Sequence, residues 1–426
     1  MSGGEYRADR SRVLLTGAAG YIGSHVHRAL LAAGHDVVAV DAMLDAVHGA
    51  NAVAPEGISR VDIRHPEQVE PLLDGIDVVC HLAAAVPLAN VPEGPVRPEP
   101  MSGRRPGARP VVGPALRDAP DLEGDGQSGR VSGAPGAGPC VRGPVAAQPE
   151  AGPQRPGPVG MQRAAVYASH NDAGTAVLLA AMERAGVRRL VLASSVAVYG
   201  EGRYRTVRGG PFFPGLRRRT DLDRGMFDHR APRTGDVLTW EPLGEDAPLR
   251  PRSAYAASKV AQEHYALAWS ASTGSAATVL RYHHVYGDSV ADSPPMRTAE
   301  SGVVARFRAE LLAGRAPRIF EDGGQVRDFV HVRDAAAATV AAVERGPAGF
   351  VPLNIASGRP LTLWEVASMM AKALNGPAPI VTGHYRITDI RHVVANPERA
   401  RHALDFTART APARGLPDYA TGGARR

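Results

Sequence analysis

The sequence of 426 residues contains little cysteine, little lysine and few aromatic side chains. Its two cysteines, Cys80 and Cys140, are too few for a disulfide framework or a four-ligand zinc site, so no structural metal is expected. No run approaches the roughly eighteen apolar residues that span a bilayer, and the charged first residues precede no hydrophobic signal core. These absences predict a protein of the reducing cytoplasm without a membrane partner.

Basic charge is concentrated in one stretch of the chain. Of the 49 basic residues only Lys259 and Lys372 are lysines. Residues 203–233 contain nine arginines and three aspartates, so this stretch alone carries the formal net charge of +6. A local basic loop is typical of a solvated surface or of a site for a small anion rather than of a long nucleic-acid face, and no nucleic-acid partner is expected.

Residues 12–85 alternate short apolar runs with helical patterns. The patterns predict strands at 13–16, 36–40 and 77–82, a helix at 21–33, and a third strand-helix unit within 61–73. The strands are continuous apolar runs, as buried parallel strands are. This alternation predicts an α/β fold with a doubly wound parallel sheet.

The composition changes abruptly after this region. Residues 91–160 hold 15 prolines and 14 glycines and lack Lys, Ile, Phe, Tyr and Trp, so they cannot bury a core. They predict a disordered or irregular insertion. Two origins fit the composition: a genuine linker, or coding sequence translated out of frame.

Order is expected again from Tyr167 onward. Helices are predicted at 171–185 and 251–270, strands at 190–193 and 277–282, and a long loop at 200–249. Shorter periodic pieces, at 303–312, 327–343 and 361–374, predict a smaller C-terminal α/β cap. Little periodicity follows Phe406.

A glycine motif separates the first strand from the first helix. In Gly17-Ala18-Ala19-Gly20-Tyr21-Ile22-Gly23, the first glycine permits a tight turn, the second lets backbone N–H groups approach a pyrophosphate, and the third allows close packing of the helix. Asp41 ends the next strand, where a carboxylate can hold ribose hydroxyls and repels a 2′-phosphate. The pattern therefore predicts a site for NAD rather than NADP. Asp62 and Ile63, after the third strand, are candidates to flank the adenine.

Tyr255 and Lys259 lie one turn apart on a predicted helix. A phenol with an ordinary pKa near 10 is a poor base at neutral pH, and an adjacent ammonium lowers that pKa. Ser195 closes a neighbouring strand, where its hydroxyl can reach the same substrate oxygen. A capping or turn role is the alternative for the serines 194 and 195.

Several motifs together resemble the extended short-chain dehydrogenase/reductase family of NAD-dependent nucleotide-sugar epimerases and dehydratases. They are Gly17 to Gly23, Asp41, His81-Leu82-Ala83-Ala84, Asn171-x-x-Gly174-Thr175, Ser194 to Gly200, Tyr255-x-x-x-Lys259, Arg281-Tyr282 and Arg327-Asp328-Phe329-Val330-His331-Val332-x-Asp334. The resemblance implies a Rossmann domain at 11–282, interrupted at 88–165 and 200–249. A cap for a nucleotide-diphosphate sugar at 283–410 and a tail at 411–426 would follow, and the resemblance also implies a homodimer through the helices at 171–185 and 251–270.

The resemblance also implies roles for individual residues. The implied catalytic residues are Ser195, Tyr255 and Lys259. The implied NAD contacts are Gly17, Gly20, Tyr21, Ile22, Gly23, Asp41, Asp62, Ile63, Ala83, Ala84, Tyr255 and Lys259. The implied substrate contacts are Ser195, His284, Arg327, Arg386 and Arg391, with surface ion pairs as the alternative for the last two. No metal ligand is implied.

Differences from the family pattern favour one branch of it. Sugar 4,6-dehydratases carry an Asp-Glu pair directly after the catalytic Ser or Thr, where this chain has Val196 and Ala197. The loop after Tyr199 resembles a bacterial subgroup of dTDP-L-rhamnose 4-epimerase-like proteins, although the Cys-Pro-x-Cys-Gly knuckle often found there is absent at 231–235. We therefore expect a 4-epimerase acting on a dTDP-6-deoxyhexose through a transient 4-keto sugar. A 4-ketoreductase and a catalytically impaired NAD-binding protein are the alternatives.

Overall fold

A parallel sheet forms the centre of the fold. The computed structural model describes residues 10–87, 160–206, 209–290 and 302–422, all of which belong to one compact unit of the chain. Seven described strands pair in parallel in the order β14-β9-β5-β4-β1-β2-β3. Their bounds are β1 Arg12–Thr16, β2 Asp36–Asp41, β3 Ile58–Arg60, β4 Val78–His81, β5 Arg189–Ser195, β9 Ala276–Tyr282 and β14 Phe350–Ile355. The predicted doubly wound sheet is confirmed.

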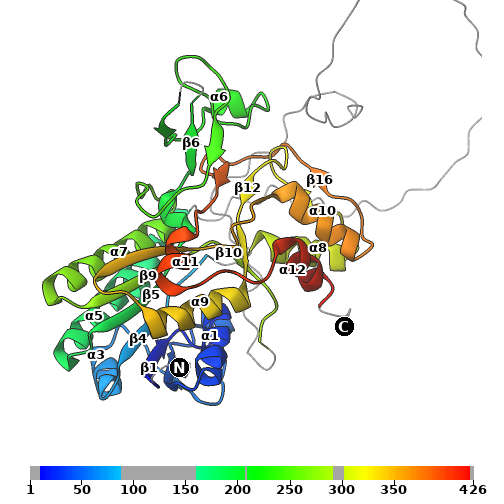
Figure 1. Ribbon diagram of the computed structural model, residues 1–426. Helices are drawn as coiled ribbons and strands as arrows, with labels where there is room; N and C mark the ends of the chain where they lie inside the picture. Colours follow the sequence, from blue (N-terminus) through cyan, green and yellow to red (C-terminus); the bar gives the residue numbers. More distant parts are fainter. Residues whose placement is uncertain (1–9, 88–159, 207–208, 291–301, 423–426) are drawn as a thin grey trace, which may run out of the picture. The chain divides into compact units, whose positions relative to one another are not determined.

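Helices cover both faces of this sheet (Figure 1). One face packs against α1 (Tyr21–Ala32) and α9 (Val332–Arg345), with Val26, Leu30 and Ala335 in the shared core. The other face packs against α5 (Gly174–Ala185) and α7 (Ala254–Thr273), with Leu178 and Ala266 in the core. The strands are apolar on both sides because both sides are covered.

The chain order reverses between β1 and β4, which are neighbours in the sheet although α1, β2 and β3 lie between them in the sequence. At such a switch point the loops from the strands' carboxyl ends diverge and leave a crevice, which is where ligands bind in open α/β sheets. The fold therefore sets the expected position of a ligand at Thr16 and His81. Their side chains are joined by a 2.7 Å hydrogen bond between Oγ1 and Nδ1.

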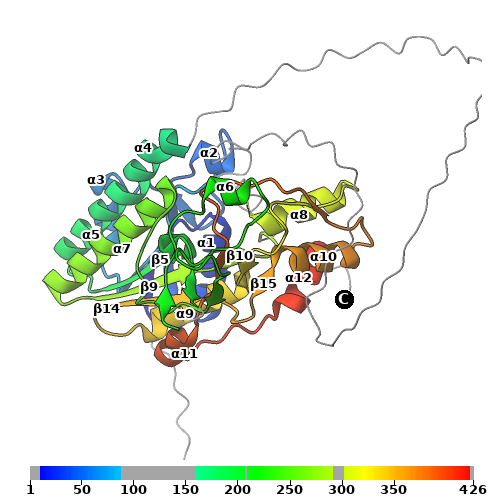
Figure 2. The ribbon, with the colours of Figure 1, turned by 90° about the horizontal axis from the view of Figure 1, so that it is seen from above.

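A smaller α/β part follows β9. It contains short strands and the helices α8 (Val303–Leu312), α10 (Leu363–Ala373) and α12 (Pro412–Ala420), whose core includes Phe307, Met370 and Leu416. The short strands are β10 His284–Tyr286, β11 Arg318–Ile319, β12 Val326–Arg327, β13 Phe329–His331, β15 Leu361–Thr362, β16 Ile380–Val381 and β17 His392–Val393. Figure 2 shows α8, α10 and α12 grouped beside the main sheet.

Several boundaries differ from those predicted. The chain returns to the main sheet after residue 282, because α9 and β14 belong to it, so a single boundary at 282/283 does not separate sheet from cap. The tail predicted at 411–426 contains α12, whose Leu416 is fully buried. The third strand, β3, lies before the predicted range 61–73, and α3 (Pro66–Val69) and a 3₁₀ turn (Glu70–Leu73) occupy most of that range. Of the predicted insertion, residues 88–159 lie outside the described residues, and α4 is helical at Ala164–Tyr167.

The segment predicted as a loop at 200–249 contains regular structure. It holds a three-stranded antiparallel sheet of β6 (Arg203–Arg205), β7 (Pro211–Phe212) and β8 (Thr239–Glu241), and the short helix α6 (Arg219–Leu222). These elements are too short to produce a periodic signal in the sequence. No described helix is long and apolar enough to cross a membrane.

Candidate active site

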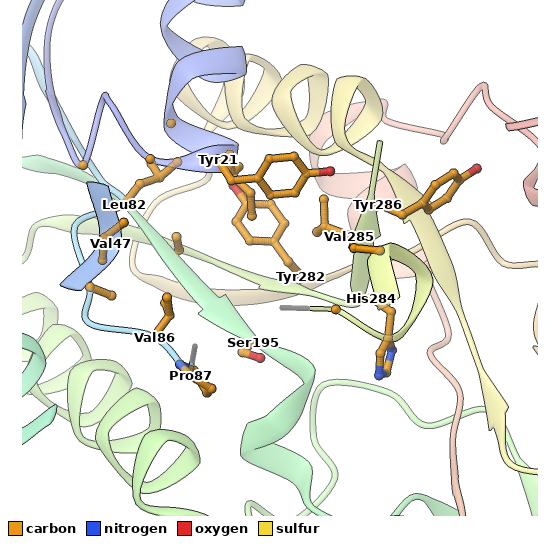
Figure 3. Close-up of a pocket in the computed structure, with 18 of the residues that line it drawn as sticks. Tyr21, Val47, Leu82, Val86, Pro87, Ser195, Tyr282, His284, Val285 and Tyr286 are labelled. Carbon is orange, nitrogen blue, oxygen red and sulfur yellow. The ribbon is translucent and has the colours of Figure 1, made fainter. Parts of the chain in front are cut away.

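A cavity of about 1460 Å³ opens at the carboxyl ends of the central strands. Figure 3 shows Tyr21, Ser195 and His284 around it, from α1, β5 and β10 respectively. Most of the predicted site residues line this one cavity. They are Gly17, Gly20, Tyr21, Ile22, Gly23, Asp41, Asp62, Ile63, Ala83, Ala84, Ser195, Tyr255, Lys259, His284 and Arg386.

The glycine loop has no room for side chains at two of its positions. Gly17 adopts a φ of +74°, and a Cβ there would lie 2.6 Å from the Ala83 nitrogen. A Cβ at Gly23 would lie 1.9 Å from the Gly17 carbonyl oxygen. The loop is therefore held against the end of β4, and its backbone N–H groups stand at the start of α1, where an anion is stabilised.

Asp41 is positioned by the same loop. Its carboxylate accepts hydrogen bonds from the backbone N–H groups of Ala19 (3.1 Å) and Met43 (2.9 Å). A carboxylate offers about four lone-pair sites, so Asp41 can still accept hydrogen bonds from a ribose. Asp62 faces the same end of the cavity, and its pKa is lowered by hydrogen bonds from Arg64, against the opposing effect of burial.

The helix α7 presents Tyr255 and Lys259 to the cavity. It begins directly after Ser253, whose hydroxyl accepts a 3.1 Å hydrogen bond from the Ala256 N–H, an arrangement that caps helix N-termini. The Lys259 ammonium donates to the Ala193 carbonyl at 2.9 Å. Burial lowers the pKa of Lys259 to about 8, although the charge of Glu263 opposes this.

Ser195 both faces the cavity and caps a turn of the backbone. It lines the cavity, and its Oγ accepts a 3.2 Å hydrogen bond from the Ala197 N–H at the start of a 3₁₀ turn (Val196–Tyr199). The capping role considered for this serine is therefore present. Because the hydroxyl acts as an acceptor in that bond, its proton remains available for a ligand.

Asn171 connects the loops around these residues. It lies in a π-helical turn (Ala168–Ala173) that precedes α5. Its side-chain amide accepts from the Ala85 N–H (2.7 Å) and donates to the Ala85 carbonyl (3.0 Å) and to Ser258 Oγ (2.9 Å). Ser258 Oγ in turn donates to the Tyr255 carbonyl at 2.8 Å. Asn171 thus fixes the end of β4 relative to the helix that carries Tyr255.

Two arginines of the cap that line the cavity lie near the same aromatic ring. The guanidinium carbons of Arg306 and Arg386 lie 6.0 and 5.2 Å from the centroid of Phe320. Burial, followed by the charge of Arg386, lowers the pKa of Arg306, so the two cations repel each other. An anion bound between them would relieve this repulsion.

His284 borders the cavity with a neutral ring. Burial, followed by the charge of Arg327, holds the pKa of His284 well below its usual range. Its Nδ1 has no hydrogen-bond partner among the described residues. A neutral imidazole offers one donor and one acceptor, which suits recognition of hydroxyl groups.

Two predicted substrate contacts lie elsewhere. Arg327 does not line the cavity, and its guanidinium donates to the backbone carbonyls of Val326, Ile390 and Arg391. Arg391 is buried and bound to three carboxylates, at 2.8 Å from Asp228, 3.0 Å from Glu321 and 2.6 Å from Asp322. Both arginines therefore lie outside the cavity lining in this structure, and their contact with substrate stays a prediction.

Arg391 belongs to a buried ion cluster that joins the segment 200–249 to the cap. Arg217 lies 2.6 Å from Glu321, and Arg252 lies 3.0 Å from Glu201. Burial alone would raise the pKa of Glu201, but the hydrogen bond and charge of His229 and the charge of Arg252 hold it well below its usual range.

Some site residues were not identified from the sequence. Arg306 had no recognisable motif around it. Glu263, four residues after Lys259, continued the face of a predicted helix and could have been identified by that spacing. Asn171 was noted only as part of a motif. The buried bond partners of Asn171 lie 86 and 87 residues away in the sequence, so its role could be assigned only in the folded chain.

Comparisons with known proteins point to one family. The sequence model of the NAD dependent epimerase/dehydratase family matches residues 13–99, 147–214 and 233–356. The chain is similar to a dTDP-L-rhamnose 4-epimerase of Burkholderia thailandensis, 31% identical over 61% of this chain and 70% of that protein. It is 26% identical to a UDP-glucose 4-epimerase of Azospirillum brasilense over 93% of this chain and 86% of that protein. A crystal structure of the Thermus thermophilus UDP-glucose 4-epimerase with NAD is 25% identical, with a TM-score of 0.61 over 97% of this chain and 99% of that chain.

Proposed function

The chain belongs to the NAD dependent epimerase/dehydratase family, and on that premise we propose that it is a nucleotide-sugar 4-epimerase acting on a dTDP-6-deoxyhexose. It is an NAD-dependent enzyme of the nucleotide-sugar epimerase group. The observation that carries the proposal is one cavity lined by the glycine loop, by Ser195, Tyr255 and Lys259, and by cationic side chains of the cap.

The described residues fit the cofactor. The loop at Gly17 and Gly23 admits no Cβ, so a pyrophosphate can approach the backbone N–H groups at the start of α1. Asp41 would hold the adenosine ribose, and the negative charge of its carboxylate disfavours a 2′-phosphate at that position. Asp62 and Ile63 would flank the adenine. Bound NAD would supply the acceptor, and later the donor, of a hydride at the sugar C4.

The side chains of this protein would handle the accompanying proton. Tyr255 accepts the proton of the C4 hydroxyl and returns it when the 4-keto sugar has presented its other face. Ser195, whose own proton is free, donates to the same oxygen. The Lys259 ammonium favours ionised Tyr255 by its charge. Hydride and proton both return to the sugar, so no reductant is consumed.

The environment of Ser195 argues against a dehydratase. Elimination of water from C6 requires an acid and a base beside the reacting carbons, but the two residues after Ser195 are Val196 and Ala197, and both line the cavity. Val86 and Pro87 add further apolar lining. An apolar surface at this position suits the methyl group of a 6-deoxyhexose better than a hydroxymethyl group.

Arg306 and Arg386 are the proposed diphosphate contacts. Both line the cavity, and both guanidiniums lie near Phe320, with Arg306 exposed and Arg386 partly buried. A diphosphate would accept charge-assisted hydrogen bonds from both guanidiniums. His284 would then lie toward the sugar as a neutral hydrogen-bonding group.

We further propose a homodimer through α5 and α7, as expected from the resemblance. The exposed surface of α7 includes Tyr265 and Leu267, each 45% exposed. Light scattering would measure the mass, and Tyr265→Asp with Leu267→Asp should give monomers. Leu31→Asp, at a 51% exposed leucine of α1, is the matched control. The cytoplasmic location stays a prediction, which cell fractionation would test.

The central test is NMR of the purified protein with substoichiometric NAD and a panel of dTDP- and UDP-hexoses, including dTDP-L-rhamnose. Appearance of a C4 epimer without net formation of NADH supports the proposal. Stoichiometric consumption of added NADH by a 4-keto sugar would instead identify a reductase. Binding of NAD with no turnover of any sugar in the panel would favour an impaired NAD-binding protein.

A further inference from the structure

A buried carboxylate lies directly behind the proposed catalytic residues. Glu263, on α7, is 1% exposed and does not line the cavity. Its Oε1 accepts a hydrogen bond of 2.5 Å from the hydroxyl of Ser194, the residue before Ser195. One helical turn earlier, Lys259 donates to the Ala193 carbonyl at 2.9 Å. Two successive residues at the end of β5 are thus attached to two successive turns of α7.

These two attachments fix the strand relative to the helix. Tyr255 lies on the same helix as Lys259 and Glu263, at intervals of four residues. Ser195 lies on the same strand as Ala193 and Ser194. A shift of β5 along α7 would break both hydrogen bonds and would change the distance between the Ser195 and Tyr255 hydroxyls.

The charge of Glu263 is balanced from the neighbouring strand. Arg281, on β9, donates from Nη2 to Glu263 Oε2 at 2.7 Å and from Nε to Oε1 at 3.0 Å. The other arm of Arg281 donates to the hydroxyl of Tyr199 and to the Glu245 carbonyl, both at 2.8 Å. Tyr199 donates onward to Asn354 Oδ1 on β14 at 2.7 Å. A buried carboxylate with all its partners present is a rigid anchor, whereas one that loses its cationic partner is costly.

We propose that Glu263 is a positioning residue, which holds Ser195 opposite Tyr255 through the hydroxyl of Ser194. This inference rests on the proposed function of Ser195 and Tyr255. Misplacement of a reacting group by about 1 Å can lower a rate roughly a hundredfold. The Ser194 bond therefore matters to the chemical step more than to ligand binding.

Ser194→Ala tests the proposal with little risk to folding, because it removes one hydroxyl and leaves the Glu263–Arg281 pair intact. We expect kcat for the identified sugar nucleotide to fall roughly tenfold to a hundredfold, with KM and the Kd for NAD within about twofold of wild type. Glu263→Gln should lower kcat in the same way. Unchanged kcat in Ser194→Ala, or a rise in KM that accounts for the whole loss, would overturn the proposal.

A matched control separates the loss of catalytic geometry at Ser195 from a general loss of protein stability. Ser270, also on α7, donates a buried hydrogen bond to the Ser275 carbonyl at 2.7 Å, far along the helix from Tyr255. Ser270→Ala should lower the melting temperature about as much as Ser194→Ala and should keep the wild-type kcat. An equal loss of kcat in both variants would show that the effect is general destabilisation.

Hydrogen–deuterium exchange makes the test independent of turnover. Ser194→Ala should speed exchange of the amides at 193–197 while leaving α1 and α9 unchanged. If the wild type turns over no sugar, faster exchange confined to 193–197 still supports the anchor, although the proposed function has failed. Wild-type exchange rates at these amides would contradict the anchor even in an active enzyme.

Discussion

The Lys259 ammonium donates its hydrogen bond to the Ala193 carbonyl, so the lysine is held by the backbone of the strand that ends in Ser195. Tyr255 and Glu263 lie four residues before and after it on the same helix, and Lys259 interacts electrostatically with Glu263 and with His81 on β4. Burial, followed by the charge of Lys259, lowers the pKa of His81 to about 3, so His81 is neutral across the working range of pH. Of these two groups, Lys259 therefore changes its charge near neutral pH and His81 does not.

This arrangement predicts a loss of activity at alkaline pH. With a pKa of about 8, Lys259 is charged below that value and neutral above it. Because the ammonium favours ionised Tyr255, kcat/KM should fall as the pH rises through about 8. The measurement is kcat/KM from pH 6 to pH 10, which reports groups of the free enzyme. A profile that stays flat to pH 10 would contradict this role of Lys259.

Tyr255→Phe should abolish most turnover while preserving NAD binding. The substitution removes the proposed base and keeps the ring, which packs against Tyr167 at a centroid distance of 5.8 Å. A general base contributes roughly 10²- to 10⁴-fold, so kcat should fall by that factor. Retained turnover would show that another group takes the proton. Tyr265→Phe, on the exposed side of α7, is the matched control.

Arg306→Ala should raise KM for the sugar nucleotide roughly tenfold to a hundredfold, the effect of losing one hydrogen bond to a charged group. NAD affinity should not change. Arg315→Ala, just beyond the end of the same helix, is the control because Arg315 is exposed and pairs with Glu310. If KM is unchanged in Arg306→Ala, the diphosphate binds elsewhere, and Arg327 becomes the next candidate after a rearrangement of the cap.

Arg391→Met should lower the free energy of unfolding and leave KM for the sugar nucleotide unchanged. Its guanidinium is 3% exposed and neutralises Glu321, which is fully buried. Glu321 would keep Arg217, at 2.6 Å, as its remaining partner, so the cost should stay below the about 3–5 kcal/mol lost when a buried charge is left without compensation. Urea unfolding would show the loss. A rise in KM with unchanged stability would instead restore Arg391 as a substrate contact.

Asp41→Ala should weaken NAD roughly tenfold to a hundredfold by loss of the charged ribose contact, and should reduce the preference for NAD over NADP. Titration with each cofactor measures both effects. Asp36→Ala, at the exposed start of the same strand, is the control. Unchanged discrimination in Asp41→Ala would place the source of selectivity outside this carboxylate.

The sequence was sufficient for features that are local or periodic. The glycine loop, Asp41 and the pair Tyr255 and Lys259 were all predicted to share a site, and all line one cavity. These features could be predicted because each depends on spacing within one strand, turn or helix, and because the carboxyl ends of parallel strands meet at one edge of the sheet.

The remaining features depend on contacts between distant segments. Arg391 was predicted as a substrate contact, yet it pairs with three carboxylates that lie 69, 70 and 163 residues away in the sequence. The strands β6 and β8 are three residues each and are stabilised by pairing with one another, which leaves no periodic signal. Buried charges and short strands are stabilised by tertiary contacts. The sequence alone therefore does not predict the role of such a charge or the position of such a strand.

The position of Tyr255 in α7 has one more consequence. The helix runs from Ala254 to Thr273, so Tyr255 lies in its first turn. The aligned peptide dipoles of a helix place a partial positive charge of about half an elementary charge at that end. This charge stabilises a nearby anion by about 0.3–1 kcal/mol. That energy corresponds to roughly a twofold to fivefold gain in the ionised fraction of the phenol. The backbone of α7 therefore acts in the same direction as Lys259, and a substitution that unwinds the first turn should weaken the base even with every side chain of the site in place.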